Sequence, residues 1–312
     1  MTSEPLDFSV SFHPCRIIPS LDISSGLFGH SPRFSEEFRS LAASYHSVSD
    51  TFVLPLSGAC EGISLLPHRF RKPMGIFPLF VDYTESFFRE QIGITKCSSI
   101  PEERITSDLF IIVNPQNPTG NYYEPSAIQR LARKNPQTTI LVDETFLEMG
   151  DSCKSVISSE MLPNILVLRS ITESSGWPSL RAGYFVSSPR LISELKRWVI
   201  PWQITALDMQ LIRWYYNHLQ EFQDSWTIQC HLKQDLARRL SSIGCSVVNN
   251  KAPFLLFSLP VERDLRELLL QRYNILVRDC RSYNLVGSYR VTPRSESENG
   301  ILANAISEII RS

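Results

Sequence analysis

Two polar side chains follow short apolar runs that predict buried β-strands. Asn117 lies in the Pro- and Gly-containing turn 114–120, which begins where the run 109–113 ends. Asp143 directly follows the next run, 139–142. The carboxyl ends of parallel strands lie at one edge of a sheet, and open α/β sheets bind ligands at that edge. We therefore expect an amide and a carboxylate to face a common ligand there.

A turn of small residues is a second candidate for binding. Gly58 and Ala59 follow an apolar pair, Val53-Leu54, and precede an apolar helical stretch. Free N–H groups at the start of a helix attract phosphate, so this turn is suited to hold one. Taken alone, the same residues fit a plain helix start better.

The segment 170–184 carries a resemblance to a known family. Its Ser-Ile-Thr-Glu, followed by Arg-Ala-Gly-Tyr, resembles the cofactor-lysine segment of fold-type I pyridoxal-phosphate enzymes. The turn 114–120, Asn-Pro-Gln-Asn-Pro-Thr-Gly, resembles the signature of class I and II aminotransferases in that superfamily. The family has a lysine where this chain has Glu173, and that lysine forms a Schiff base with the cofactor. A carboxylate cannot form this bond.

The resemblance implies a role for each matched residue. Asn117 would bond the ring hydroxyl oxygen of the cofactor, and Asp143 would keep its pyridine nitrogen protonated, so that the ring acts as an electron sink. Tyr83 would stack on the ring; a core tyrosine is the alternative. Arg290 would bind the substrate α-carboxylate as a bidentate fork. The other implied cofactor contacts are Gly58, Ala59, Phe146, Ser170 and Arg181.

Two further patterns resemble one branch of the family. Val-Arg-Asp-Cys at 277–280 and Asp-Phe-Ser-Val at 7–10 are similar to threonine-phosphate decarboxylases and histidinol-phosphate aminotransferases. Ser11 and His13 stand where those relatives have Asn, which leaves their phospho-substrate open for this chain. The Tyr-Pro pair whose tyrosine reaches the partner subunit's cofactor in relatives is absent. His30 stands nearby, and its role is open.

Glu173 admits three interpretations. In the first, the protein binds pyridoxal or pyridoxamine phosphate noncovalently, and Glu173 pairs with the ammonium of pyridoxamine phosphate and serves as general base. In the second, the chain is a catalytically inactive homologue that acts as a binding or assembly partner. In the third, the lysine was replaced deliberately to trap a ligand.

The first interpretation is favoured by the charge of Asp143. Without a pyridinium partner, we expect this carboxylate to be a costly buried charge. Without the cofactor, Glu173 and Asp143 would also raise each other's pKa. None of the seven lysines matches a cofactor position of the family, and we expect all of them on the surface.

The elements that must position these residues are predicted by alternating apolar runs and helical patterns. Continuous apolar strands separated by helices indicate an α/β fold with a mainly parallel sheet covered on both faces. The resemblance implies seven strands in this sheet. The predicted strands are 109–113, 139–142, 165–168 and 184–186, and the predicted helices are 125–134, 191–198, 207–218 and 221–240.

The C-terminal part predicts a second, smaller α/β unit. Its expected strands are 254–257, 275–277 and 288–292, and its expected helices are 265–273 and 299–311. We expect a large cofactor-binding domain of residues 31–220 and a small domain that combines residues 1–30 with 221–312.

Composition narrows the class of protein. The chain has 312 residues, 43% hydrophobic and 20% charged, which is ordinary for a globular protein. A net charge of -1 gives no reason to expect nucleic acid, and no apolar run approaches a membrane span. Seven scattered cysteines and the lack of a signal-peptide pattern predict a cytoplasmic protein without a metal site. By resemblance we expect a homodimer that acts on a small-molecule amino substrate.

Overall fold

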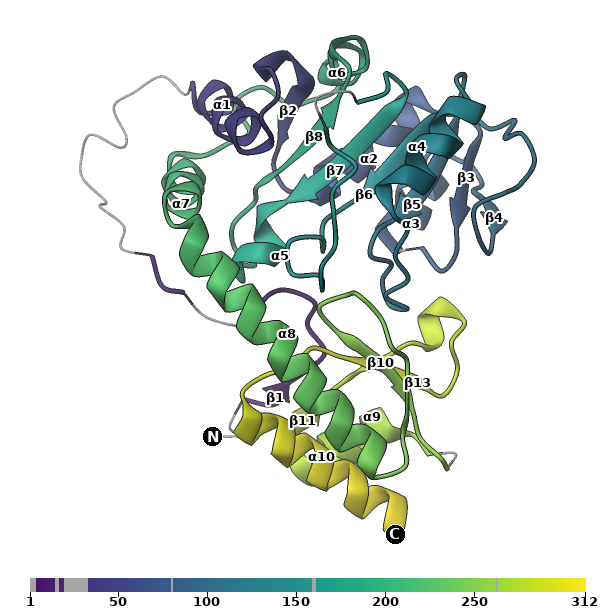
Figure 1. The fold of residues 1–312 in the computed structure, drawn as a ribbon, viewed down its shortest axis with the longest axis vertical. Helices are drawn as coiled ribbons and strands as arrows, with labels where there is room; N and C mark the ends of the chain where they lie inside the picture. The colour runs from purple at the N-terminus through teal and green to yellow at the C-terminus, as the bar shows by residue number, and fades with distance from the viewer. Residues whose placement is uncertain (1–3, 15–16, 20–32, 80, 159–160, 262) are drawn as a thin grey trace.

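A seven-stranded sheet forms the centre of the larger part of the molecule (Figure 1). The computed structural model describes residues 4–14, 17–19, 33–79, 81–158, 161–261 and 263–312. All neighbouring strands of the sheet are parallel except β8, which is antiparallel to both β2 and β7. The mainly parallel α/β fold expected from the sequence is therefore confirmed. In spatial order the strands are β2 (Val53–Leu56), β8 (Gly183–Ser187), β7 (Ile165–Ser170), β6 (Thr139–Asp143), β5 (Leu109–Val113), β3 (Pro73–Ile76) and β4 (Thr95–Cys97).

Helices cover both faces of this sheet, which explains why its strands are continuous apolar runs. Successive residues of β7 point to opposite faces, so Val167 packs in one hydrophobic cluster and Leu168 in the other. The first cluster includes residues of α1 (Phe34–His46), α4 (Pro125–Lys134) and α7 (Ala206–Asn217). The second includes residues of α2 (Ala59–Arg69), α3 (Val81–Arg89) and α6 (Pro189–Lys196).

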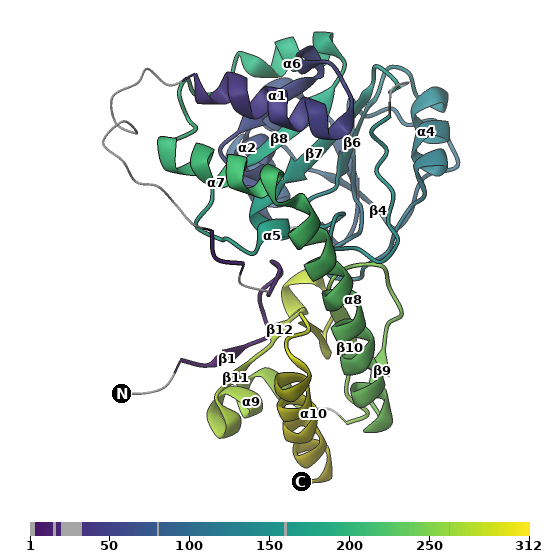
Figure 2. The same ribbon diagram turned by 60° about the vertical axis from the view of Figure 1, so that its left-hand side comes forward.

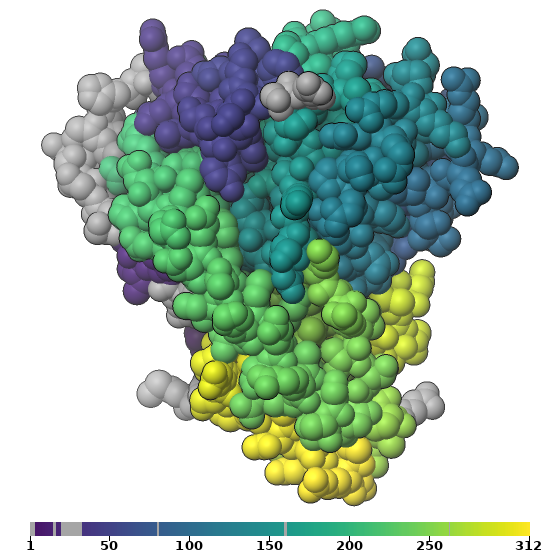
Figure 3. Space-filling model, viewed as in Figure 1, coloured from purple at the N-terminus to yellow at the C-terminus, as the bar shows by residue number. Residues whose placement is uncertain are grey.

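A smaller part is built around a four-stranded antiparallel sheet. Its strands in spatial order are β12 (Arg278–Asp279), β13 (Ser288–Val291), β10 (Leu255–Ser258) and β9 (Ser246–Val247). Its helices are α9 (Leu265–Tyr273) and α10 (Glu296–Arg311), and η3 (Arg281–Tyr283) is a short 3-10 helix. The space-filling view shows this part, coloured yellow-green to yellow, below the larger one (Figure 3).

One long helix and the N-terminal segment connect the two parts. The helix α8 (Leu219–Ser242) runs from the larger part to the smaller one (Figures 1 and 2). Near the N-terminus, β1 (Leu6–Asp7) pairs in parallel with β11 (Ile275–Leu276). The break between α7 and α8 lies at residue 218, close to the predicted domain boundary at residue 220. The predicted domain bounds themselves remain predictions.

Local signals account for several of the helix ends. α4 and α9 have the predicted bounds, and α4 has Pro125 at its first position, where a missing N–H costs nothing. α10 begins three residues earlier than expected because Ser295 and Glu298 form a capping box. No helix within the described ranges is long and apolar enough to cross a membrane.

Candidate functional site

The predicted site residues gather at one edge of the seven-stranded sheet. β2, β5, β6 and β7 run in the same direction, so their carboxyl ends share this edge, and β8 begins there. Gly58 follows β2, and Asn117 follows β5. Asp143 and Ser170 are the last residues of β6 and β7, and Arg181 shortly precedes β8. The chain thus places an amide, a carboxylate, a hydroxyl and a guanidinium at the ligand-binding edge of an α/β sheet.

Asp143 is buried and has a hydrogen-bond donor on each oxygen. The Tyr83 hydroxyl donates to Oδ2 at 2.8 Å, and the Thr145 N–H donates to Oδ1 at 3.0 Å. Burial raises the pKa of Asp143, while the bonds from Tyr83 and Thr145 lower it. The raised pKa agrees with the expected cost of burying this carboxylate, and two neutral donors from α3 and the loop after β6 offset part of that cost.

Asn117 and Arg290 connect the larger sheet to the smaller one. Arg290 lies in β13, is 4% exposed, and donates from Nη1 to Asn117 Oδ1 at 2.8 Å and from Nη2 to the Ser9 carbonyl at 2.6 Å. Its guanidinium carbon lies 5.2 Å from the centre of the Phe254 ring. Phe146 packs edge-to-face on the same ring at 5.5 Å. The amide of Asn117 is thereby oriented with its oxygen toward Arg290 and its nitrogen away from it.

Glu173 lies at the start of a short helix beside this group. α5 (Ile171–Ser175) begins directly after Ser170. Burial, and then the charge of Asp143, raises the pKa of Glu173, whereas Ser170 and Arg181 lower it. Asp143 thus raises the pKa of Glu173 as expected, although burial is the larger cause, whereas the carboxylate that raises the pKa of Asp143 is its neighbour Glu144.

The start of α2 forms the cationic end of the site. Gly58 is the N-cap of α2, with a φ of +82° and no side-chain cap. A Cβ atom at Gly58 would lie 2.9 Å from Arg181 Cζ, so the guanidinium packs directly against the backbone there. Ala59, the first residue of α2, is 7% exposed. A helix N-terminus and a guanidinium meeting in this way suit an anion such as phosphate.

Several polar atoms of the site form no hydrogen bond to the described part of the chain. Four such buried side-chain atoms belong to predicted site residues, and each comes from a different element or loop. Buried polar atoms are normally paired, so a cluster of unpaired ones points to a polar ligand. These four atoms are Asn117 Nδ2, Ser170 Oγ, Glu173 Oε2 and Arg290 Nε.

Arg278 is a site residue to which the sequence assigned no role. It is the direct cross-strand neighbour of Arg290 in the antiparallel pair β12–β13. Side chains in such pairs lie about 5 Å apart at Cβ, and like charges there destabilise a sheet. No salt bridge joins either guanidinium to a carboxylate in the described ranges. Two such arginines favour an anionic ligand. The only sequence signal that pointed to Arg278 was the family-like pattern at 277–280.

Two expectations about basic residues have different outcomes. Lys233 is not on the surface: it is 6% exposed, and its Nζ donates to the carbonyls of Asn250 and Ala252 at 2.9 and 2.8 Å. Hydrogen bonds to two carbonyls explain how an ammonium is tolerated there. His30 lies outside the described residues.

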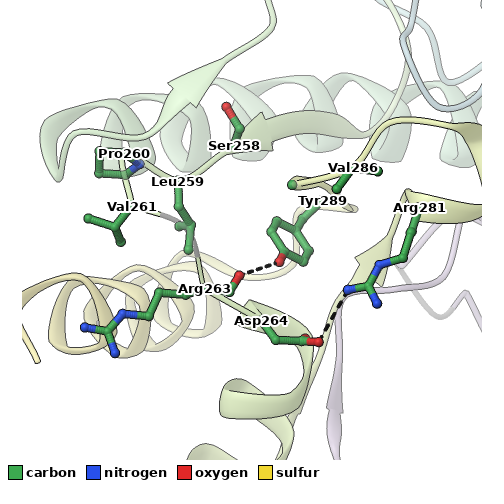
Figure 4. A pocket seen from close by; sticks show the side chains of 10 residues that line it. Ser258, Leu259, Pro260, Val261, Arg263, Asp264, Arg281, Val286 and Tyr289 are labelled. Carbon is green, nitrogen blue, oxygen red and sulfur yellow. Dashed lines mark hydrogen bonds and ion pairs between the residues drawn. The ribbon is translucent and has the colours of Figure 1, made fainter.

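A cavity in the smaller part is separate from this group. It has a volume of about 540 Å³ and lies beside the start of α9 (Figure 4). Arg281 pairs there with Asp264 at 3.3 Å, and Tyr289 bonds the Arg263 carbonyl at 2.9 Å. None of the predicted site residues lines this cavity.

Comparison with known proteins agrees with the fold. The family model described as aminotransferase class I and II matches residues 94–306, more than half of the chain. The chain belongs to this family.

Individual relatives point to one branch of it. A histidinol-phosphate aminotransferase of Aromatoleum aromaticum is 28% identical over 218 residues, 68% of this chain and 60% of the relative. Histidinol-phosphate aminotransferase 1 of Methylococcus capsulatus is 27% identical over 302 residues, 88% of this chain and 81% of the relative. In the Aromatoleum protein and two further relatives, the matched region spans only 55% to 60% of their own length.

Solved structures share the fold across the chain. L-threonine-O-3-phosphate decarboxylase from Porphyromonas gingivalis has a TM-score of 0.86 at 19% identity, covering 98% of this chain and 100% of that one. Histidinol-phosphate aminotransferase from Sinorhizobium meliloti, solved in complex with pyridoxal-5'-phosphate, has a TM-score of 0.84 at 13% identity, covering 99% and 92%. At these identities the likeness shows the fold alone.

Proposed function

We propose that this protein binds pyridoxal or pyridoxamine phosphate noncovalently and acts on an amino acid or amino-phosphate. The observation that carries the proposal is the cluster of unpaired polar atoms on Asn117, Ser170, Glu173 and Arg290. The resemblance implies contacts of these same four residues with the cofactor or substrate. Family membership supports the cofactor class, since one similar structure is a complex with pyridoxal-5'-phosphate.

Each end of the site suits one end of the cofactor. Gly58, Ala59, Ser170 and Arg181 would hold the phosphate, through the start of α2 and the guanidinium. Asp143 would hold the ring nitrogen, and the free Nδ2 of Asn117 would donate to the ring hydroxyl oxygen. Phe146 packs edge to face on Phe254, which also contacts Arg290. Tyr83 has no exposed surface and packs in a hydrophobic cluster, which favours the core alternative over stacking on the pyridine.

Glu173 takes the place of the covalent anchor. When bound, the cofactor supplies an electron sink that stabilises negative charge at the substrate carbon. The unpaired Oε2 of Glu173 would accept a hydrogen bond from an ammonium and, as a carboxylate with a raised pKa, can take or return a proton there. Ordinary transamination at full rate is not expected, because the family lysine also moves that proton.

The arginine pair supports a substrate with an anionic group. Arg290 offers its unpaired Nε, and Arg278 lies directly opposite it. Because a dianion would relieve the repulsion between the two guanidinium groups, an amino-phosphate fits this end better than a neutral amine. The names of the similar proteins, histidinol-phosphate aminotransferase and threonine-phosphate decarboxylase, agree with this chemistry. A homodimer in the cytoplasm completes the proposal.

Ligand binding tests the proposal directly. The melting temperature should rise with pyridoxal phosphate and more with pyridoxamine phosphate, since a ligand at a hundred times its Kd stabilises a folded protein by about 2.7 kcal/mol. Glu173→Gln should abolish the preference for pyridoxamine phosphate. The exposed Glu85→Gln is the control, and it should bind as the wild type does.

A second variant tests the geometry of the pocket. Glu173→Lys should restore covalent attachment of pyridoxal phosphate, which borohydride reduction and mass spectrometry would locate at position 173. No thermal shift with either ligand would contradict the proposal. The inactive homologue that acts through protein contacts would then be the better account.

A further inference from the structure

The hydroxyl group of Tyr83 has a role beyond that of its ring. It donates to Asp143 Oδ2 at 2.8 Å; Tyr83 is 0% and Asp143 is 4% exposed. We propose that this hydroxyl orients Asp143, keeps it ionised, and so sets the pH range in which the site binds a protonated pyridine. The proposal rests on the proposed function, because pyridine is the ring of the cofactor assigned above. Tyr83 is therefore a positioning residue.

The two donors on Asp143 come from separate elements. Tyr83 belongs to α3, whereas the Thr145 N–H that reaches Oδ1 belongs to the loop after β6. With one donor on each oxygen, the plane of the carboxylate is fixed. A carboxylate has about four acceptor positions, so two remain for a ligand. Asp143 can thus keep both protein bonds while it accepts one from a ring N–H.

The groups that face this pair from the neighbouring elements are acidic. Glu144, beside Asp143 in sequence, raises the pKa of Asp143, and Asp143 in turn raises the pKa of Glu173 in α5. Asp82 of α3 and Cys60 of α2 raise the pKa of the Tyr83 hydroxyl. Burial and the charge of Glu144 favour the neutral form of Asp143. The hydrogen bonds from Tyr83 and Thr145 are the interactions that favour its ionised form.

The effect of removing the hydroxyl follows from the strength of such a bond. A hydrogen bond to a buried carboxylate changes its pKa by about one to two pH units. Tyr83→Phe keeps the ring and removes the donor, so the pKa of Asp143 should rise by that amount. A protonated pyridine needs the ionised acid, so its affinity falls as the pH drops through this pKa. In the variant, the fall should begin at a higher pH.

Calorimetric titration with pyridoxamine phosphate across the acid range is the test. We expect the acid limb of the affinity profile to move up by about one to two pH units in Tyr83→Phe, with binding at the acid end weaker by about ten- to a hundredfold. At pH values above this limb, the wild type and Tyr83→Phe should bind the ligand with equal affinity. In the Asp143→Asn background, Tyr83→Phe should no longer move the limb, and what remains of the limb belongs to Glu173, which pairs with the ammonium of the ligand. Tyr289→Phe, which removes another buried hydroxyl bonded to the Arg263 carbonyl at 2.9 Å, should leave the limb in place.

A measurement without ligand separates this inference from the proposed function. The carboxyl ¹³C signal of Asp143, assigned by its loss in Asp143→Asn, reports the pKa of Asp143 directly in wild type and Tyr83→Phe. A higher pKa in the variant supports the inference, and an equal pKa overturns it. If the wild type binds pyridoxamine phosphate but the acid limb does not move in Tyr83→Phe, the inference fails and the proposed function stands. If wild type binds no pyridine at any pH, the proposed function fails, and with it the role in binding.

Discussion

Gly58 shows how one residue without a side chain shapes the anion end of the site. Its φ of +82° is rarely adopted by other residues, and Arg181 occupies the space where a Cβ atom would lie. A substitution there strains the backbone and displaces the guanidinium together. Both changes act on the group that would hold a phosphate. Asp143, which is proposed to hold the ring nitrogen, lies on a different strand, β6.

Gly58→Ala should weaken phosphate recognition selectively. We expect the affinity for pyridoxamine phosphate to fall about tenfold or more, equivalent to about 1.4 kcal/mol, and the affinity for pyridoxamine to change little. Calorimetry with both ligands measures the difference. Gly93→Ala is the control, since nothing lies within 4 Å of a Cβ atom there. An equal loss for both ligands would mean that the turn does not hold the phosphate.

At the scale of elements, His13 connects three segments next to Glu173. Its N–H donates to the Glu173 carbonyl at 2.8 Å, and its ring bonds Ser225 and Gln229 of α8. Trp226 of α8 also donates to the Ser174 carbonyl of α5, at 2.8 Å. The N-terminal segment, α5 and α8 are thus held together at the position of the missing lysine.

This junction should make the protein sensitive to acid. Burial lowers the pKa of His13 from 6.5 to about 4, with His13 only 1% exposed. As the pH falls below 6.5, the unfolded chain binds a proton that the folded chain does not, so stability is lost between pH 6.5 and about 4. The full loss is about 3 kcal/mol. Urea unfolding across this range measures it.

His13→Asn should reduce this slope without abolishing it. His46, whose pKa burial and then Arg169 lower to about 2, would still contribute. A slope in His13→Asn equal to that of the wild type would show that His13 is not the group that titrates.

The whole molecule exposes large apolar side chains between α6 and α7. Trp198, Ile200 and Trp202 are 48%, 69% and 76% exposed within five residues of sequence. Large apolar side chains exposed together in one short segment are typical of interaction sites, and a second copy of the chain is the partner that the proposed homodimer requires. The segment covers β2, since Gln203 Nε2 donates to the Pro55 carbonyl at 2.8 Å. A partner bound here would therefore lie near the strand that leads to Gly58.

Trp202→Asp should convert the dimer to monomer, because it buries a charge in an apolar interface. Sedimentation equilibrium at micromolar concentration measures the change in mass. Phe88→Asp is the matched control: Phe88 is 80% exposed on α3, and its replacement should leave the dimer intact. A wild-type monomer, or a dimer in Trp202→Asp, would contradict the assignment of this surface.

Much of the framework was determined by the sequence alone, because its signals are local. The strand Leu109–Val113 and the helices Pro125–Lys134 and Leu265–Tyr273 have the predicted bounds, since apolar periodicity, a first-turn proline and caps act over a few residues. Strand ends in a parallel sheet share an edge, so the gathering of Asn117, Asp143 and Ser170 was also predictable.

Only the tertiary structure decided which side chains are partners. Tyr83 donates to Asp143 from 60 residues away, His13 reaches α8 across more than 200, and Lys233 is buried by a loop that follows its helix. Arg278 and Arg290 face each other because β12 and β13 pair in one register. Such contacts depend on how separate elements pack, and packing is set by the sum of many weak interactions that no short stretch of sequence contains.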